Sequence, residues 1–107
     1  MYKRQFLSCG HPEGFGLPLA EAIACGCLVV GYHGLAGRDF ALPHMHEVEF
    51  GDLLGLLKGL EQELARFDAS PETVIQERLA ASETILKNYG LEAELDCCLR
   101  TWGHICP

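Results

Sequence analysis

Two glutamates, Glu13 and Glu21, flank a glycine-containing turn in the segment HPEGFGLPLAEAIACG, residues 11–26. The segment follows an apolar stretch and leads into a helical pattern. We therefore expect it at the carboxyl end of a strand, where open α/β folds bind ligands. Because a carboxylate accepts two hydrogen bonds from vicinal hydroxyls, Glu21, near the first turn of the helix, is predicted to bind a ribose. Glu13 lies earlier in the loop and is predicted to face a group further out.

Backbone groups of the same loop suit a phosphate. Gly14 and Gly16 allow the backbone to approach a ligand closely. The amides near Leu17 and Leu19, at the start of the helix, are expected to be free, and the helix dipole there favours an anion. Together these groups predict a binding site for a nucleotide-sugar donor. Taken alone, the glycines also fit a simple turn, and the glutamates also fit acids that suit the helix dipole.

Over residues 5–40 the chain resembles the retaining glycosyltransferases of GT-B fold, family 4. The resemblance rests on EGFGLPLAE from Glu13 to Glu21, which is similar to the E-x7-E region of that family. Ala-Cys-Gly at residues 24–26 and the apolar stretch from Leu28 to Gly31 follow in the same order. Leu28 stands where the family often has proline, and the loop at residues 34–39 lacks the glutamate that often ends it, so the donor stays open.

The resemblance implies a role for each residue of the motif. Glu13 would contact hydroxyls of the donor sugar, and Glu21 would hold the ribose. The backbone amides that would lie against the sugar and the diphosphate belong to Gly14, Phe15, Gly16 and Leu17. The family transfers a hexose from a nucleoside diphosphate with retained anomeric configuration and needs no metal, so no cofactor is expected beside the donor. Phe15 is equally expected to be a hydrophobic anchor of the loop.

The resemblance also implies what would lie elsewhere. Enzymes of this type have two Rossmann-like domains, and their acceptor domain and the Arg/Lys pair that neutralises the diphosphate come earlier in the chain. We therefore expect this chain to match the last half of the donor domain, as a fragment or truncated product, and to be inactive alone. Arg38 is the nearby cation that the sequence offers for a phosphate.

Two further sets of residues could carry chemistry. His44, His46 and Glu47, with Cys9 and His11, are metal ligands by type, but their spacing does not match a structural zinc pattern. We expect these histidines to lie in loops without binding a metal.

The chain has six cysteines, which we expect as free thiols in a reducing compartment. The pair at residues 25 and 27 is expected in the core, and one of the adjacent pair at residues 97 and 98 is expected to be buried.

The elements that position the loop are predicted from the apolar pattern. Residues 2–8 read as a strand, residues 17–25 as a short helix with Pro18 in its first turn, and residues 28–32 as a buried parallel strand. Gly26 suits the position just past the helix end. This order is a βαβ unit. Residues 33–50 are irregular, with room for one short strand or helical turn.

Three helical patterns follow residue 50. Ser70, Pro71 and Glu72 are a strong helix start, and Gly90 is expected to end that helix. The expected apolar stripes are Leu53, Leu57, Leu60, Leu64 and Phe67 with Leu56 beside them; Ile75, Leu79, Ser82, Leu86 and Tyr89; and Leu91, Leu95, Cys98, Leu99 and Trp102. Trp102 is expected to be a core anchor of the last helix.

The composition and charge of the chain limit the kinds of partner that it is expected to bind. The chain has 107 residues, 49% of them hydrophobic, and a formal charge of −7 from 8 basic and 15 acidic residues. This composition is typical of one globular domain. No basic patch favours nucleic acid, no apolar run is long enough for a membrane span, and no signal peptide is evident, so we expect a cytoplasmic protein. The acidic charge should repel a diphosphate unless local amides or cations supplied elsewhere offset it.

We therefore predict an α/β fold: a single domain over residues 1–107, with a βαβ donor-site unit at residues 1–50 and a helical part at residues 51–107. It would be a partial Rossmann-like unit of GT-B type, with two or three parallel strands, one crossover helix and three C-terminal helices. Such a sheet leaves an edge and an apolar face open, which predicts a homo-oligomer or association with the missing half of the fold. Two functions follow: a glycosyltransferase donor half-site, or a non-catalytic half-domain for oligomerisation or regulation.

Overall fold

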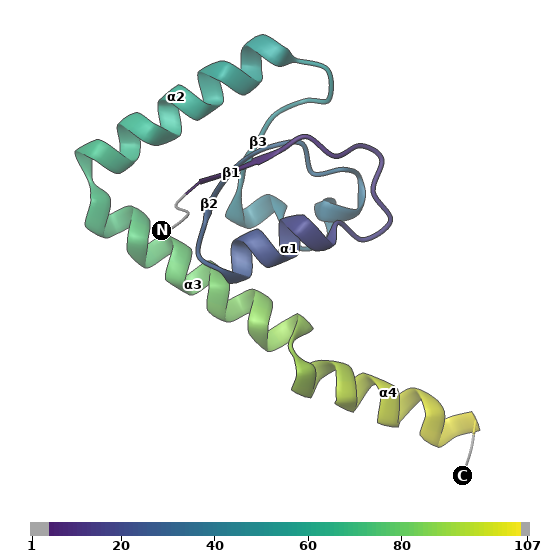
Figure 1. Cartoon of the computed structure of the whole chain (residues 1–107). Coiled ribbons are helices and arrows are strands. Elements are labelled where there is room, and N and C mark those ends of the chain that lie inside the picture. The colour runs from purple at the N-terminus through teal and green to yellow at the C-terminus, as the bar shows by residue number, and fades with distance from the viewer. Residues whose placement is uncertain (1–4, 106–107) are drawn as a thin grey trace.

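The structure is a computed structural model that describes residues 5–105. Its sheet has three parallel strands, β1 (Gln5–Ser8), β2 (Leu28–Gly31) and β3 (His46–Glu47), in the order β1-β2-β3. The predicted α/β class, the parallel sheet and the first two strands are confirmed, and residues 2–4 of the first predicted strand lie outside the described residues. Helix α2 (Leu53–Ala69) lies over one face of the sheet, and helices α1 (Leu17–Ala24) and α3 (Pro71–Tyr89) lie on the other side (Figure 1).

Strand β2 is the centre of the sheet and is buried along its whole length. Val29 and Val30 point to opposite faces, since successive side chains alternate along a strand. Val29 belongs to the core shared with α1 and α3, and Val30 to a smaller core under α2. The register pairs Phe6 with Val29 and Leu7 with Val30. Leu7 is nevertheless 46% exposed, because β1 is an edge strand and α2 does not reach over it.

Helix α1 (Leu17–Ala24) connects β1 to β2, and both of its ends are set by glycine. Gly16 precedes it with a φ of 84°, and Pro18 lies in the first turn as predicted. At the other end, Gly26 has a φ of 75° and its N–H donates to the Ile23 carbonyl. The Cys27 N–H donates to the Ala22 carbonyl, which completes a Schellman motif.

Two short 3₁₀ turns, η1 (Ala36–Arg38) and η2 (Leu42–His44), join β2 to β3. They fill the segment that the sequence predicts to be irregular. Phe40 and Ala41 between them are buried in the core with α1.

Helix α2 (Leu53–Ala69) begins at Asp52, whose carboxylate accepts the Gly55 N–H at 2.8 Å. Its packed face agrees with the predicted stripe only in part: Leu60 and the neighbouring Leu56 pack toward the sheet, together with Gly59. The leucines at positions 53, 57 and 64 are exposed on one flank. Gly59 is buried, and a Cβ there would lie 3.1 Å from the His46 ring, which is a tight contact. The absence of a side chain at Gly59 therefore favours the close packing of α2 against β3.

The last two helices are α3 (Pro71–Tyr89) and α4 (Leu91–Ile105), with the predicted start at Ser70-Pro71 and break at Gly90 confirmed. Their predicted stripes are not the packed ones. Helix α3 buries a neighbouring face, which consists of Val74, Ala81 and Ile85. Helix α4 buries none of its residues, so the expectation that Trp102 anchors the core is wrong: it is 60% exposed.

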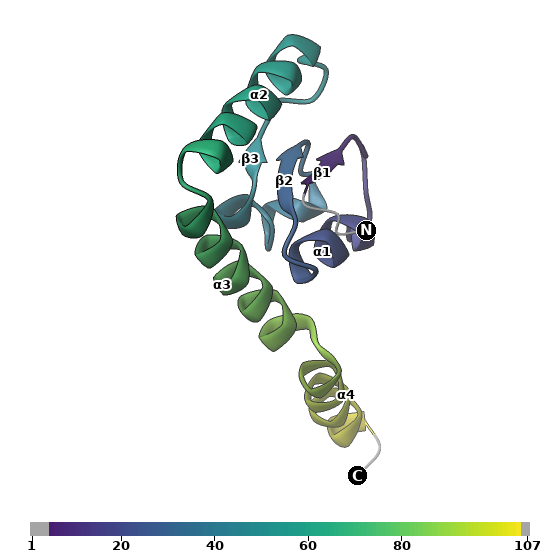
Figure 2. The same ribbon diagram turned by 60° about the vertical axis from the view of Figure 1, so that its left-hand side comes forward.

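Helix α4 extends away from the rest of the molecule (Figures 1 and 2). The radius of gyration is 15.8 Å, whereas a compact domain of this length has about 13 Å. The apolar flank of α3 and the apolar face of α4 are consequently left without cover by residues 5–105.

The cysteines differ in part from expectation. Among residues 5–105, the cysteines at positions 9, 25, 27, 97 and 98 carry thiols and form no disulfide, as predicted, but only Cys27 is half-buried and the other four are exposed. Cys106 lies outside the described residues. Among residues 5–105, no helix has both the length and the apolar character that crossing a bilayer requires.

Charged side chains connect β3, α2 and α3 at the opposite end of the strands from the predicted site. His46 Nδ1 lies 3.0 Å from Glu63 Oε1. Arg66 Nε donates to Glu63 Oε2 at 3.0 Å, and Arg66 Nη1 donates to Glu77 Oε2 at 2.6 Å. Burial alone raises the pKa of Glu63, but the hydrogen bonds from His46 and Arg66 outweigh it, so the pKa lies below its ordinary value.

The contact between β1 and β2 predicts a strict requirement for Gly31. This residue has a φ of 136°, and a Cβ on it would lie within 2.1 Å of the Ser8 carbonyl oxygen. We expect Gly31→Ala to lower the free energy of unfolding by about 2–4 kcal/mol, because strain and overlap add. Gly14→Ala is the matched control, since nothing lies within 4 Å of a Cβ there. Urea denaturation measures both; equal stabilities would contradict the close approach.

The Glu63 network predicts a pH-dependent contribution to stability. Glu63→Gln is expected to lower the free energy of unfolding by about 1–3 kcal/mol at neutral pH, since it removes charge-assisted hydrogen bonds. A carboxyl whose folded-state pKa is lowered stabilises the fold above its ordinary pKa of 4.5 and loses that contribution as pH falls further. The difference from wild type should therefore shrink in acid. Glu61→Gln, an exposed acid on the same helix, should show neither effect.

Candidate functional site

The candidate site is formed by the two loops that leave the carboxyl ends of β1 and β2. The Ser8 hydroxyl donates to the Tyr32 carbonyl oxygen at 2.7 Å, and the Tyr32 N–H donates to the Ser8 carbonyl at 2.8 Å. The Glu13 N–H donates to the Gly34 carbonyl at 2.9 Å. These three bonds hold the loops side by side, so residues far apart in the sequence line one space.

Glu13 lies between two glycines, one from each loop. A Cβ on Gly10 would lie within 2.2 Å of Glu13 Oε1, and a Cβ on Gly34 would lie within 2.8 Å of Glu13 Cγ. The side chain therefore lies against both loops, while the residue as a whole remains exposed. Within residues 5–105 its carboxylate has no hydrogen-bond or ion-pair partner, which leaves both oxygens able to accept hydroxyl groups.

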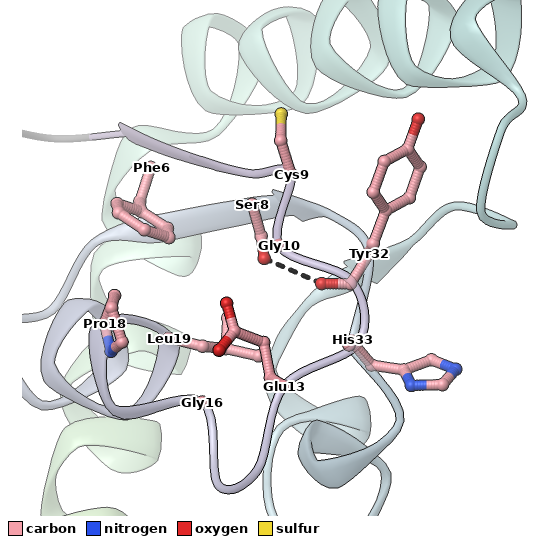
Figure 3. A pocket seen from close by; sticks show the side chains of 11 residues that line it. Phe6, Ser8, Cys9, Gly10, Glu13, Gly16, Pro18, Leu19, Tyr32 and His33 are labelled. Carbon is pink, nitrogen blue, oxygen red and sulfur yellow. Dashed lines mark hydrogen bonds between the residues drawn. The ribbon is translucent and has the colours of Figure 1, made fainter.

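The Glu13 carboxylate points into a small cavity between β1 and α1 (Figure 3). The cavity has a volume of about 50 Å³. Its lining includes Ser8, Gly10, Glu13, Gly16 and Leu19. Because a water molecule occupies roughly 30 Å³ in the liquid, this space admits one or two hydroxyl-sized groups and not a whole sugar ring. A ligand could therefore insert hydroxyl groups here while its body lay outside.

The amides at the start of α1 agree with the prediction in part. Gly14, Phe15, Gly16 and Leu17 have no partner for their N–H groups among the described residues. The Leu19 N–H is not free as predicted, because it donates to the Gly16 carbonyl at 3.0 Å. The positive φ of Gly16 turns that carbonyl back into the helix and closes the first turn. The free donors are thus those of the turn before the helix.

Glu21 lies apart from this cavity. It is the fifth residue of α1 and is exposed, on the face that it shares with Leu17, whereas Leu19 and Ile23 occupy the buried face. Its carboxylate also has no partner among residues 5–105. The structure therefore brings Glu13 and Gly16 into the cavity and places the other four predicted residues, Gly14, Phe15, Leu17 and Glu21, on the surface that leads away from it.

Phe15 has ring partners within the chain. Its ring stacks on Phe40 at 4.9 Å between centroids and lies 5.6 Å from Tyr89 near the end of α3. This arrangement favours the anchor role over stacking on a ligand. It also connects the loop to α3, since Phe40 packs edge-on against Tyr89.

A second, larger hollow adjoins the first and shares Tyr32, His33 and Gly34 with it. Its volume is about 410 Å³, which is in the range of ligand sites. His33 points away from Glu13 (Figure 3). Its Nδ1 accepts the Leu35 N–H at 2.9 Å, and its Nε2 lies 3.4 Å from Glu47 Oε1. A ring nitrogen that accepts an N–H carries no proton, so the proton lies on Nε2 and faces Glu47.

The loop that carries His33 holds a backbone outlier. Leu35 has a φ of 71°, a region that a leucine rarely adopts. Arg38, the cation considered for a phosphate, lies in the larger hollow and not in the Glu13 cavity. Strained positions of this kind cluster at functional sites.

The metal alternative finds no support in the geometry. Within residues 5–105 no three metal-ligating side chains converge. His46 is engaged by Glu63, and Glu47 faces His33.

Comparison of the chain with protein-family models, curated proteins and solved structures gave no match.

Gly10 and Gly34 shape the space around Glu13, but neither belongs to the motif that predicts the site. Both lie two or three residues beyond a parallel strand, and that position is a signal, because the ends of adjacent parallel strands converge at one edge. Phe50, which lines the larger hollow, carries no such signal. Its position at the site depends on the course that the chain takes after β3, which no local sequence pattern predicts.

The hydrogen bonds of His33 predict its tautomer. We expect neutral His33 to be protonated at Nε2 and not at Nδ1, because Nδ1 accepts the Leu35 N–H. Ring nitrogen chemical shifts in a long-range ¹⁵N–¹H spectrum distinguish the two forms. Glu47→Gln should leave the tautomer unchanged, since the Leu35 amide fixes it. A protonated Nδ1 in the neutral ring would contradict the loop geometry.

Proposed function

We propose that this chain carries the donor half-site of a retaining glycosyltransferase and binds a nucleotide-diphosphate sugar through Glu13, Glu21 and the amides between them. The fold in this proposal is a partial Rossmann-like unit of GT-B type, with its site at the carboxyl ends of β1 and β2. A nucleotide-sugar donor places such a protein in the cytoplasm. Neither metal nor another cofactor takes part.

The observation that carries the proposal is the unpaired carboxylate of Glu13, held between Gly10 and Gly34 in a cavity of hydroxyl size. A carboxylate that packs against two glycines and has no partner within residues 5–105 is able to accept hydrogen bonds from a ligand. An acid that served only the helix dipole would be expected to point toward the free amides of the first turn. Glu13 instead folds away from the helix N-terminus into the space between the two loops.

The free amides support the phosphate part of the proposal. Four consecutive N–H groups, those of residues 14–17, lack partners within the described chain. The turn and the start of α1 together give an anion a set of donors and the positive end of the helix dipole. The net charge of −7 opposes a diphosphate, so tight binding would require cations from another part of the fold or from a partner.

The second candidate function is a non-catalytic half-domain that serves oligomerisation or regulation. A specific observation favours it: the exposed apolar residues of α4, which include Leu91, Leu95, Leu99 and Trp102, face away from all cover within residues 5–105. The edge of β1 is also open. Both features fit association with a second copy or with the missing half of a glycosyltransferase fold.

Ligand-observed NMR with UDP, GDP and ADP, and with their sugar conjugates, tests the donor site. We expect one nucleotide to bind and its sugar conjugate to bind more tightly. Glu21→Ala should weaken binding of the nucleotide, because Glu21 is assigned to the ribose. Glu13→Gln should remove only the additional affinity that the sugar provides, because Glu13 is assigned to the sugar hydroxyls.

Two further variants sharpen this test. Gly10→Ala should displace the Glu13 carboxylate, because the added methyl overlaps its flexible end while the backbone has room. It should therefore act like Glu13→Gln on the sugar and leave stability nearly unchanged. Glu61→Gln removes the same charge far from the site and should have no effect. If none of the three nucleotides binds, the proposed donor site is refuted and the non-catalytic function remains.

Sedimentation at increasing protein concentration tests the association surface. We expect wild type to self-associate or to remain unstable as a monomer, and Leu95→Glu to abolish the association, because a charge on the apolar face of α4 cannot be buried cheaply. Glu92→Gln, on the same helix, is the control. A monodisperse monomer at high concentration would contradict self-association.

A further inference from the structure

The larger hollow at the ends of β2 and β3 is not used by the donor site, and its lining has a chemistry of its own. We propose that it binds a neutral saccharide ring. The residues that carry the argument are His11, Tyr32, Arg38, Glu47, Glu49 and Phe50. They come from four separate segments of the chain, which the parallel sheet brings to one edge.

Phe50 provides an apolar platform of fixed orientation. Its ring stacks on His11 with centroids 3.9 Å apart and an interplanar angle of 17°. Tyr32 meets it edge-on at 5.4 Å, and Tyr32 is itself buried in the core under α2. Held on two sides, Phe50 remains 59% exposed. An exposed, immobilised aromatic ring suits the C–H face of a sugar, which is apolar and nearly flat.

Polar groups around the platform match hydroxyl groups. Glu47 keeps one carboxylate oxygen toward His33 Nε2, which orients it, while its side chain is still 51% exposed. Glu49 and Arg38 line the same hollow. Carboxylates accept hydrogen bonds and a guanidinium donates them, so a ligand whose hydroxyls do both is matched at several points.

The charge of the hollow selects a neutral ligand. With its histidines neutral, the lining carries Arg38 against Glu47 and Glu49, an excess of one negative charge. The whole chain, with the hollow included, has a formal charge of −7 at pH 7. A phosphate or carboxylate would therefore be repelled, whereas an uncharged polyhydroxylated ring would not. The volume of about 410 Å³ accommodates a saccharide ring with room for water.

Titration of the ¹⁵N-labelled chain with neutral methyl glycosides and disaccharides, without nucleotide, tests the proposal. We expect amide shifts at residues 32–38 and 47–50 and weak, millimolar affinity for at least one saccharide. Phe50→Ala should weaken that binding about tenfold or more, because it removes the stacking platform. Leu54→Ala removes an exposed apolar side chain of α2 outside the hollow and should leave it unchanged.

Each other result overturns the proposal. Shifts that persist in Phe50→Ala would mean that the platform does not bind the ring. Tighter binding of glucose 6-phosphate than of glucose would identify an anion site instead. No shift in the hollow with any neutral saccharide would refute binding directly. Glu49→Gln, which spares the Glu47–His33 pair, should weaken binding in a folded protein, and circular dichroism verifies the fold of each variant. Nucleotides are assigned to residues 13–21, so the two sites succeed or fail separately.

Discussion

The architecture of the candidate site depends on the close approach of β1 to β2 at their carboxyl ends. The Ser8 carbonyl accepts the Tyr32 N–H, the Ser8 hydroxyl returns a bond to the Tyr32 carbonyl, and Gly31 has no side chain to keep the strands apart. Because the two loops begin from this junction, their paths are fixed relative to each other. Glu13 can then lie against glycines of both loops, and His33 can turn outward to Glu47.

The absence of a side chain at several glycines allows this close packing. At Gly10 and Gly34 a Cβ would overlap the Glu13 side chain, and at Gly59 a Cβ would be in tight contact with the His46 ring. These glycines therefore help to set where the two side chains lie. In the proposed donor site, such packing would restrict the Glu13 carboxylate before binding and so lower the entropy lost when a ligand binds.

The helical part leaves much of its apolar surface exposed. The sheet is covered by α2 on one face and by α1 and α3 on the other, yet Leu7, the flank of α3 and the face of α4 remain exposed. A domain of about 100 residues has only a modest surplus of hydrophobic stabilisation. Exposed apolar surface on this scale fits a unit whose stable form includes further protein. This exposed apolar surface is the observation on which the proposed association surface rests.

The sequence by itself determined the local elements. Gly26 and Gly90 as helix ends, Ser70-Pro71 as a helix start and the β-branched run of β2 each act through backbone conformation or burial over a few residues. The position of the Glu13 loop after a parallel strand followed from the same local pattern. The helical period also predicted where α2, α3 and α4 lie.

Tertiary structure decided which face each helix buries and which residues share a cavity. On α2 and α3 two apolar faces compete, and contact with Val30 and α1 selects Leu56 and Ala81 over Leu57 and Leu79. Leu19 loses its free amide because Gly16 curls the first turn, and Phe50 joins Tyr32 only after the chain has crossed β3. These outcomes depend on contacts between residues distant in sequence, and no local spacing encodes such contacts.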